Sequence, residues 1–251
     1  MKLIKNYIIW KLYNLFNRYC KFHLNLLIPG ISLVIDKYKN KTETTGTNYS
    51  NLHEAVKTIL KKKPKWILES GTGTSTLVFA ETILQMQKKD PNYHCRIVSM
   101  ESTMKWYEMA KNLLPKKYSN IVEIRFGPRK IFEYSMFRGY VHTNIPNHAY
   151  EFVFLDGPNY TDEFGTSTCM DAIYVRLQSQ LPLVSCVIST RVTSVWMMQQ
   201  IFGNKLIKYF PYYRTCTVDM PPIKANPQLD SRSFSSNLLG KLRPNKLTKN
   251  N

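Results

Sequence analysis

The chain has 251 residues, of which 43% are hydrophobic, so it can form one α/β domain with a full core and modest appendages. This length excludes a second catalytic domain. The formal net charge of +18 suits an anionic partner such as nucleic acid, an acidic membrane face or an acidic glycan, or else a solvated lysine-rich surface. The five cysteines are odd in number and form no C-x-x-C pair, which predicts a reducing compartment without disulfides or a zinc site.

The first 40 residues combine apolar side chains at helical spacing with interspersed Lys and Arg. The apolar run is too broken to span a bilayer, and it lacks the cleavage site of a signal peptide. We therefore expect a helix that lies on an anionic membrane, or that packs on the domain or on a second subunit. The expected organisation is a basic amphipathic segment and linker over residues 1–48, a folded domain over 49–220 and a polar tail over 221–251.

The middle of the chain alternates between strand-like and helix-like patterns after a first helix that Ser50 is expected to cap. The sequence predicts strands at 66–69, 96–100, 121–126, 152–156 and 184–189, and helices at 75–88, 103–114, 166–179 and 192–202. Segments 206–210 and 215–219 then flank a turn, as in an antiparallel hairpin. This order predicts a doubly wound, mostly parallel seven-stranded sheet that ends in the hairpin. Residues 127–150 are expected to form a long loop, either functional or disordered.

A glycine-rich turn joins the first predicted strand to the next helix, with the sequence Glu69-Ser70-Gly71-Thr72-Gly73-Thr74-Ser75-Thr76. Such a turn presents free backbone N–H groups to a nucleotide-like ligand. A nicotinamide fingerprint requires a third glycine where Thr76 stands, and a P-loop requires a Gly-Lys-Ser/Thr triplet that does not follow. The carboxylate of Glu69 would repel a pyrophosphate but attract an ammonium group. These features favour S-adenosylmethionine (SAM), which carries an ammonium and a sulfonium.

The second predicted strand ends at Glu101, where a carboxylate suits a ribose hydroxyl pair. Residues 50–219 resemble the class I SAM-dependent methyltransferases. The resemblance rests on the glycine-rich turn, on Glu101 and on the segment 152–158 (Phe-Val-Phe-Leu-Asp-Gly-Pro). The resemblance implies that the turn holds the methionine end of SAM, that the acid holds the ribose and that the next residues flank the adenine. The implied cofactor-binding residues are Glu69, Gly71, Thr72, Gly73, Thr74, Ser75, Thr76, Glu101, Ser102, Thr103, Met104 and Asp156. The chain departs from the family after the third strand, where Phe126-Gly127-Pro128 replaces an acid or amide near the adenine.

Asp156 ends the fourth strand at the sheet edge where ligands of open α/β sheets bind, which makes it the candidate general base or, alternatively, an anchor for its own loop. Arg191 follows the fifth strand and is a candidate clamp for an acceptor carboxylate or phosphate, or an ordinary surface residue. Further candidates for acceptor binding are Tyr160, Asp162 and His142. The fifth strand supplies no metal ligands, so no metal is expected.

The sequence thus predicts a SAM-dependent methyltransferase of a small-molecule or carbohydrate-like acceptor, cytoplasmic and near the inner face of a membrane. Two alternatives stay open. One is an RNA or protein methyltransferase, for which the +18 charge is the electrostatic footprint. The other is a binding or scaffold protein that keeps the fold without catalysis. The acceptor and the oligomeric state do not follow from the sequence.

Overall fold

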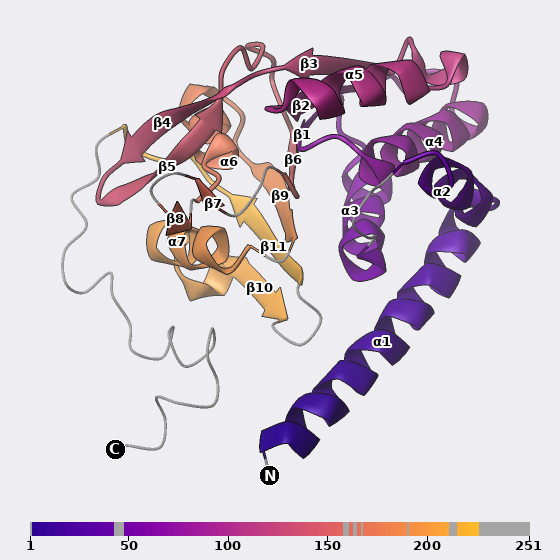
Figure 1. The fold of residues 1–251 in the computed structure, drawn as a ribbon. Helices are drawn as coiled ribbons and strands as arrows, with labels where there is room; N and C mark the ends of the chain where they lie inside the picture. Colours follow the sequence, from indigo (N-terminus) through magenta and orange to yellow (C-terminus); the bar gives the residue numbers. More distant parts are fainter. Residues whose placement is uncertain are drawn as a thin grey trace.

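A seven-stranded sheet runs through the molecule in the order β10-β11-β9-β6-β1-β2-β3 (Figure 1). The computed structural model describes residues 2–42, 48–157, 161–162, 165–166, 168–189, 191–210 and 215–225. The strands of the sheet are β1 (Trp66–Ser70), β2 (Arg96–Glu101), β3 (Val122–Phe126), β6 (Phe152–Leu155), β9 (Val184–Ser189), β10 (Ile207–Phe210) and β11 (Thr215–Met220). Strand β11 pairs antiparallel with both of its neighbours, whereas the pairs from β9 to β3 are parallel. The predicted doubly wound sheet with its terminal hairpin is therefore confirmed.

Helices cover both faces of this sheet. They are α1 (Lys2–Leu27), α2 (Ile31–Lys39), α3 (Tyr49–Lys62), α4 (Thr74–Lys89), α5 (Met104–Leu113), α6 (Asp171–Gln178) and α7 (Val192–Phe202), with short 3-10 turns at Lys116–Tyr118 and Asn204–Leu206. Two hydrophobic clusters follow from this arrangement. The first cluster contains residues of the four helices α1, α2, α3 and α4 and of one side of the sheet. The second contains residues of α6 and α7 and of the opposite side.

The alternation of side chains along each strand assigns its residues to these two clusters. On β1, Ile67 lies in the cluster beneath α4, and Leu68 lies in the cluster beneath α6. The neighbouring β2 repeats the pattern with Ile97 and Val98. Strands buried on both faces read as continuous apolar runs, which is why the sequence located them well.

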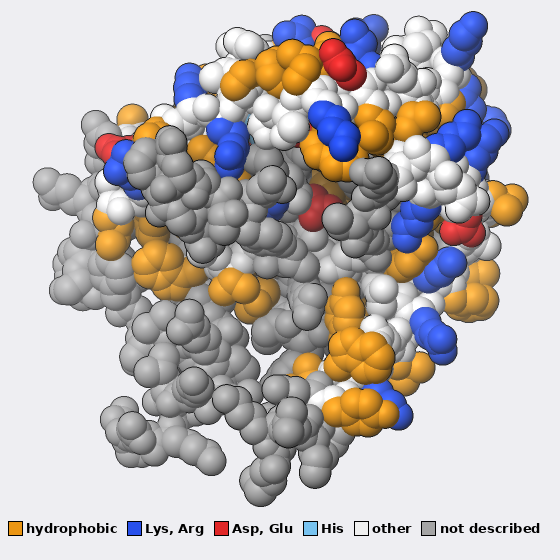
Figure 2. All heavy atoms as spheres, in the orientation of Figure 1, with side chains coloured by type: hydrophobic (Ala, Val, Ile, Leu, Met, Phe, Trp, Pro, Cys, Tyr) orange, Lys and Arg blue, Asp and Glu red, His pale blue; other side chains and the backbone are white. Residues whose placement is uncertain are grey.

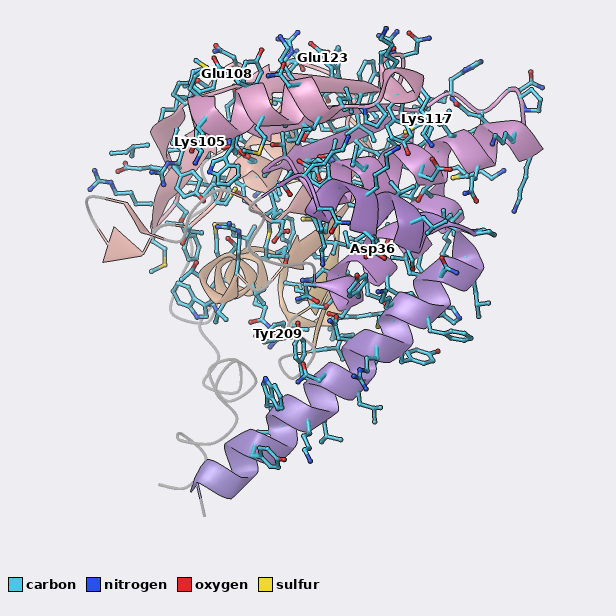
Figure 3. The ribbon with its side chains drawn as sticks, turned by 45° about the vertical axis from the view of Figure 1, so that its right-hand side comes forward. Asp36, Lys105, Glu108, Lys117, Glu123 and Tyr209 are labelled. Atoms are coloured by element: carbon cyan, nitrogen blue, oxygen red, sulfur yellow. The ribbon has the colours of Figure 1, made fainter. Side chains whose placement is uncertain are left out.

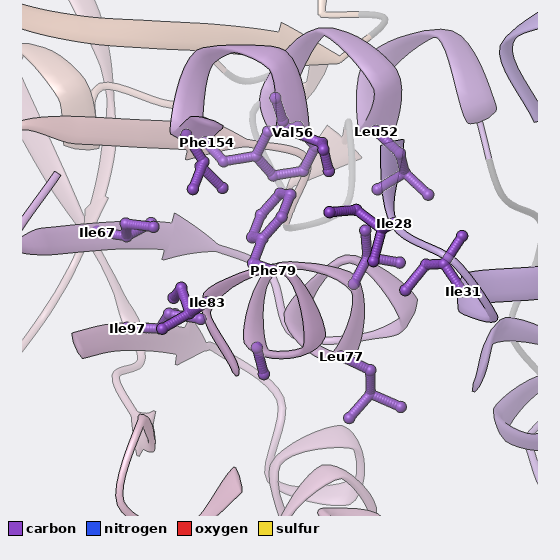
Figure 4. Close-up of a cluster of buried hydrophobic side chains, with 14 of the residues drawn as sticks. Ile28, Ile31, Leu52, Val56, Ile67, Leu77, Phe79, Ile83, Ile97 and Phe154 are labelled. Carbon is purple, nitrogen blue, oxygen red and sulfur yellow. The ribbon is translucent and has the colours of Figure 1, made fainter. Parts of the chain in front are cut away.

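Phe79 of α4 lies at the centre of the first cluster (Figure 4). Its ring is fully buried and contacts Phe154 of β6 edge to face, with the ring centroids 5.0 Å apart. Val56 of α3 packs in the same cluster. This packing fastens α4 to the sheet, and with it the glycine-rich turn that precedes the helix.

The segment between β3 and β6 differs from its prediction. A long functional or disordered loop was expected over residues 127–150, but the chain forms a second, two-stranded sheet from β4 (Arg129–Tyr134) and β5 (Phe137–His142). The hairpin packs against α6 and α7 through three buried aromatic side chains, those of Tyr134, Phe137 and Tyr140. The hairpin thus covers part of a sheet face where the predicted scheme left a loop.

Two helix starts also differ from their predictions. The helix expected at 166–179 begins at Asp171, because Thr168 and Met170 form backbone hydrogen bonds with Tyr140 of β5. Before them, Thr161–Asp162 (β7) and Gly165–Thr166 (β8) pair as a short antiparallel ladder. Helix α3 begins one residue before Ser50, and its cap is Asn48, whose side-chain oxygen accepts a hydrogen bond from the Ser50 N–H at 3.2 Å. Lys63 ends α3 in the left-handed conformation, ahead of Pro64.

Helix α1 extends away from the sheet as a long arm (Figures 1 and 3). Its second half packs on the domain, since Cys20 and Leu24 are buried in the cluster with α3. Among the described residues, no helix combines the length and the apolar content needed to cross a bilayer. All five cysteines are buried and free.

The packing of Phe79 generates a stability prediction. Phe79→Ala should lower the free energy of unfolding by about 3–5 kcal/mol, because it removes a fully buried ring from a close-packed cluster. The matched control is Phe22→Ala on the exposed side of α1, which should change it by no more than about 0.5 kcal/mol. Urea unfolding followed by circular dichroism measures both, and equal losses would contradict the central place of Phe79.

Candidate active site

The candidate site is built at the carboxyl ends of β1, β2 and β6, where three loops meet. Alternation along β1 sends Glu69 to the same side as Ile67, beneath α4, and Ser70 to the opposite side. On β2, Ser99 and Glu101 share the side of Ile97. The parallel pairing of β1 with β2 sets Glu69 directly beside Ser99. Two carboxylates therefore come together on the α4 side of this edge.

Glu69 is fully buried and holds three elements together. Its Oε2 accepts hydrogen bonds from the Thr76 hydroxyl of α4 and the Ser99 hydroxyl of β2, each at 2.6 Å. The same Thr76 hydroxyl oxygen accepts the Gly73 N–H at 3.0 Å. The hydroxyl at position 76, where a nicotinamide site has glycine, thus fastens the glycine-rich turn to the carboxylate below it.

The second carboxylate oxygen of Glu69 is in a different position from the first. Its Oε1 is buried and has no hydrogen-bond partner among the described residues. Burial raises the pKa of the Glu69 carboxyl to about 7, although the neighbouring hydroxyls of Ser75, Ser99 and Thr76 lower it. Buried charges normally have a partner. A cationic group placed beside this carboxyl would supply that partner and favour its ionised form.

Gly71 permits a direct contact between the turn after β1 and the turn after β6. Its φ is +94°, and a Cβ at this position would lie 2.4 Å from the Gly157 Cα. The Gly157 N–H donates a hydrogen bond to the Ser70 carbonyl at 2.5 Å, and the Gly71 N–H donates to the Met100 carbonyl at 2.9 Å. Glycine is therefore required here by both backbone conformation and space.

Gly73 is different, because a Cβ built on it would meet no atom of the described residues within 4 Å. The space above the turn is open at this residue. The hydroxyl of Thr74, which follows it, is buried without a hydrogen-bond partner among the described residues. Open space beside unused polar groups is what a ligand cradle requires.

Glu101 lies at the end of β2, nine-tenths buried, and organises the start of α5. Its Oε1 accepts the N–H groups of Ser102 at 2.8 Å and Thr103 at 2.9 Å, while the Thr72 hydroxyl lies 3.4 Å from Oε2. The carboxylate thereby links the glycine-rich turn to the loop after β2. Thr103 and Met104, predicted beside the adenine, are exposed at this edge.

The third strand contributes close backbone packing in place of an acid. A Cβ on Gly127 would lie 2.3 Å from the Thr143 carbonyl oxygen and 2.7 Å from the Met100 side chain. Phe126, just before it, packs on Tyr107 of α5 with ring centroids 5.7 Å apart. The departure from the family pattern noted in the sequence therefore coincides with the crowded junction that leads into the hairpin.

Asp156 follows β6 with an exposed side chain and a fixed backbone. Its N–H donates to the Ser70 carbonyl at 3.1 Å, and its own carbonyl accepts the Arg191 Nη2 at 2.8 Å. The carboxylate is thus free to face a ligand while its main chain is anchored. Arg191 is only 3% exposed, and its Nη1 lies 3.4 Å from the Tyr140 hydroxyl. Arg191 thus connects the turn after β6 to the hairpin and is buried. The sequence interpretation had expected an exposed side chain at this position.

His142 is also buried, in a polar cluster on the other side of β1. The ring Nδ1 of His142 lies 2.6 Å from Asp171 Oδ2, and the backbone N–H of His142 donates a hydrogen bond to Asp171 Oδ1. Asp171 Oδ2 also accepts a hydrogen bond from the Ser70 hydroxyl at 2.6 Å. Burial raises the pKa of Asp171, but attraction to His142 and these hydrogen bonds hold it below its ordinary value. The Nε2 of His142 has no hydrogen-bond partner among the described residues.

Sequence reasoning missed Ser70 and Asp171 as members of this cluster. The available signals were that Ser70 lies inside the glycine-rich motif and that Asp171 is an acid within an otherwise apolar stretch. Tyr160 lies outside the described residues. Asp162 is described in β7 by its backbone alone. Within the described part of the chain, no three His, Cys, Asp or Glu side chains converge as metal ligands.

The comparisons with known proteins bear on the fold. The sequence matches no family model and no curated protein. The structure is similar to that of a Staphylococcus aureus protein described as a caffeoyl-CoA O-methyltransferase, with a TM-score of 0.53, 14% identity and coverage of 82% of this chain and 99% of the other. It is also similar to TomG of Streptomyces achromogenes, an O-methyltransferase involved in tomaymycin synthesis and solved in complex with SAM, with a TM-score of 0.50, 14% identity and coverage of 82% and 96%.

At this level of identity the likeness concerns architecture. The strand order, the reversed strand β11 and the glycine-rich turn after β1 occur together in one chain. The protein therefore has the fold of the class I SAM-dependent methyltransferases.

Proposed function

We propose that this protein is a SAM-dependent methyltransferase that acts on a small-molecule or carbohydrate-like acceptor, with a hydroxyl as the favoured acceptor group. The observation that carries the proposal is the buried Glu69 carboxyl, whose Oε1 has no described partner directly below an open glycine-rich turn. A turn of this kind with an acid below it suits a ligand that has a cationic end. The favoured hydroxyl rests on the two similar structures, both described as O-methyltransferases, one of them bound to SAM.

The residues of this edge fit the cofactor part by part. Glu69 would supply the negative charge for the ammonium. The N–H groups of Gly71 and Gly73 are bonded to Met100 and Thr76, so the backbone N–H groups of Thr72, Thr74 and Ser75 would face the methionine end. Glu101 would accept the ribose hydroxyls, and Ser102, Thr103 and Met104 would border the adenine. Bound SAM supplies a methyl group that its sulfonium has already activated for displacement.

Asp156 is the residue proposed to face the acceptor. Its backbone is held by Ser70 and Arg191, so its exposed carboxylate has a fixed origin at the edge of the sheet. A carboxylate in this place can accept the proton of an acceptor hydroxyl as the oxygen becomes nucleophilic. Holding the acceptor in line with the transferred group supplies the larger part of the rate.

Substitutions at the two glycines of the turn should separate binding from folding. Gly73→Ala should leave the free energy of unfolding within about 1 kcal/mol of wild type, because its backbone is extended and its Cβ would meet no protein atom. It should nevertheless weaken SAM binding by about tenfold or more, since the methyl group enters the proposed cradle. Gly71→Ala should destabilise the protein itself by about 2 kcal/mol or more.

Isothermal titration calorimetry with SAM and urea unfolding test this pair. Glu108→Gln on the outer side of α5, labelled in Figure 3, is the neutral control. Wild-type protein that gives no heat of SAM binding would sink the proposal and leave a scaffold role. Unimpaired SAM binding by Gly73→Ala would remove the turn from the binding site.

The raised pKa of Glu69 predicts a pH dependence of SAM binding. Above its pKa of about 7 the carboxyl is ionised and attracts an ammonium, and below it the neutral acid does not. The dissociation constant for SAM should therefore increase by up to about tenfold as the pH falls from about 8 to about 6. Glu69→Gln should bind weakly with no such slope, whereas Glu101→Gln should bind weakly and keep it. Parallel slopes in the wild type and Glu69→Gln would assign the titration to another group.

The same shift predicts the opposite trend for the stability of the protein without ligand. Glu69 binds its proton more tightly when folded than when unfolded, so folding is favoured at low pH. The contribution should be complete below about pH 4.5 and lost as the pH rises through about 7, with a slope of up to about 1.4 kcal/mol per pH unit. Urea unfolding of the wild type and Glu69→Gln over this range isolates it.

Substitution of Asp156 tests the acceptor side. Asp156→Asn should retain SAM affinity but lower the turnover number by about 100-fold or more, because the amide cannot take a proton. Transfer of a labelled methyl group to a panel of hydroxyl, carboxylate and amine acceptors measures this, with Asp36→Asn on α2 as the control (Figure 3). Full turnover by Asp156→Asn would limit Asp156 to positioning its loop.

A further inference from the structure

Helix α1 presents one stripe of apolar side chains to solvent. Its members follow each other at alternating intervals of three and four residues, which places them on one line along the helix. They are Leu12, Leu15, Tyr19, Phe22 and Leu26, all more than half exposed. Leu15 and Phe22 are the most exposed of them, at 66% and 64%. Scattered apolar residues are ordinary on a surface, but a continuous line of this length is typical of an interaction site.

The opposite side of the same helix is already occupied. Cys20 and Leu24 are buried against the domain, and Asn17 accepts a hydrogen bond from the Ser50 N–H of α3 at 3.2 Å. His23 lies at the border of the stripe, where its ring stacks on Tyr19 with centroids 5.6 Å apart and its Nδ1 lies 2.9 Å from Nε2 of His53 in α3. These contacts fix the rotation of α1 about its axis. The apolar stripe cannot turn inward to be buried by the domain without breaking them.

Positive charge lies beside the stripe and is not balanced within the helix. Lys11 and Arg18 each precede a stripe member by one residue, so both flank it. The helix has no Asp or Glu, and the first acidic residue of the chain is Asp36 on α2. Figure 2 shows hydrophobic and basic side chains interleaved over the region of α1.

We propose that α1 binds the surface of an anionic lipid bilayer, with the stripe defined above inserted between the headgroups and Lys11 and Arg18 paired with lipid phosphates or carboxylates. An apolar line with adjacent basic residues is the pattern of a helix that lies in the interface. The charge argues against a second copy of this chain as the occupant. Two copies of α1 would bring basic rows together without an acidic side chain in either helix to pair with them.

The arm-like position of α1 gives this binding a consequence for the candidate site. The helix projects from the side of the domain that carries α2 and α3 (Figures 1 and 3). Its C-terminal half is fastened to the same cluster that holds α4. Binding through α1 would therefore hold the whole domain at the lipid surface. The proposal does not depend on methyl transfer.

Cosedimentation of the full-length protein with vesicles tests the proposal. Binding is expected to mixed phosphatidylcholine and phosphatidylserine vesicles, and to be much weaker with phosphatidylcholine alone. The double variant Leu15→Gln with Phe22→Gln should lose about tenfold or more in vesicle affinity. Its matched control is Ile131→Gln with Met136→Gln, two residues of comparable exposure on the β4–β5 hairpin, which should bind as the wild type does.

A second pair of variants tests the charge. Lys11→Gln with Arg18→Gln should weaken binding to anionic vesicles by about thirty-fold and flatten its salt dependence. Lys88→Gln with Lys89→Gln, exposed at the end of α4, removes the same charge elsewhere and should have a much smaller effect. Unfolding midpoints equal to that of the wild type establish that all four variants are folded.

Two results would overturn the proposal. The wild type could fail to sediment with anionic vesicles, or the stripe variant could sediment with them as well as the wild type does. In the second case, a change in the mass of the stripe variant by sedimentation velocity would identify a second copy as the occupant.

Discussion

The site depends on a buried acid that is only half satisfied. Glu69 lies near the carboxyl end of β1, and its Oε2 accepts hydrogen bonds from hydroxyls of both α4 and β2. Removing a carboxylate from water is costly, and full compensation requires partners on both oxygens. The described residues provide them for Oε2 and give Oε1 no hydrogen bond. The glycine-rich turn is seated on this junction through Thr76, so the shape of the cradle and the charge beneath it have one physical origin.

The two sides of the sheet serve this edge in different ways. On the α4 side, carboxylates are gathered where a cationic ligand would bind. On the α6 side, the polar groups hold one another: Asp171 connects Ser70 to His142, and Arg191 connects Asp156 to Tyr140. The hairpin supplies both His142 and Tyr140. Through these contacts the hairpin supports the turns after β1 and β6 on the α6 side of the sheet. The main chain of Asp156 is therefore held in place, while its carboxylate is exposed.

The success of sequence analysis followed the strength of local patterns. Strands such as β9 were placed well because buried apolar runs are local signals. The hairpin was missed because β4 is mostly exposed, with Tyr134 its buried residue, and so lacks the apolar run of a buried strand. The cap of α3 was misplaced by two residues because Asn48 and Ser50 are equally good caps.

Side-chain burial at the site was harder to predict. Arg191 and His142 resemble surface residues in the sequence. Their partners lie 35 and 29 residues away along the chain, so burial depends on contacts that only the folded topology creates. Glu69 and Glu101 lie at the same edge of the sheet because they stand near the ends of neighbouring parallel strands.

The pressed backbones of Gly71 and Gly157 restrict how this chain can vary. A side chain at either residue would occupy the space of the other, since the Cβ of each would lie within 2.4 Å of its partner's Cα. Each glycine therefore makes the other indispensable, and neither can be replaced first. In close relatives of this chain, both glycines should be retained, or both should be replaced together with a change in the length of one of the two loops.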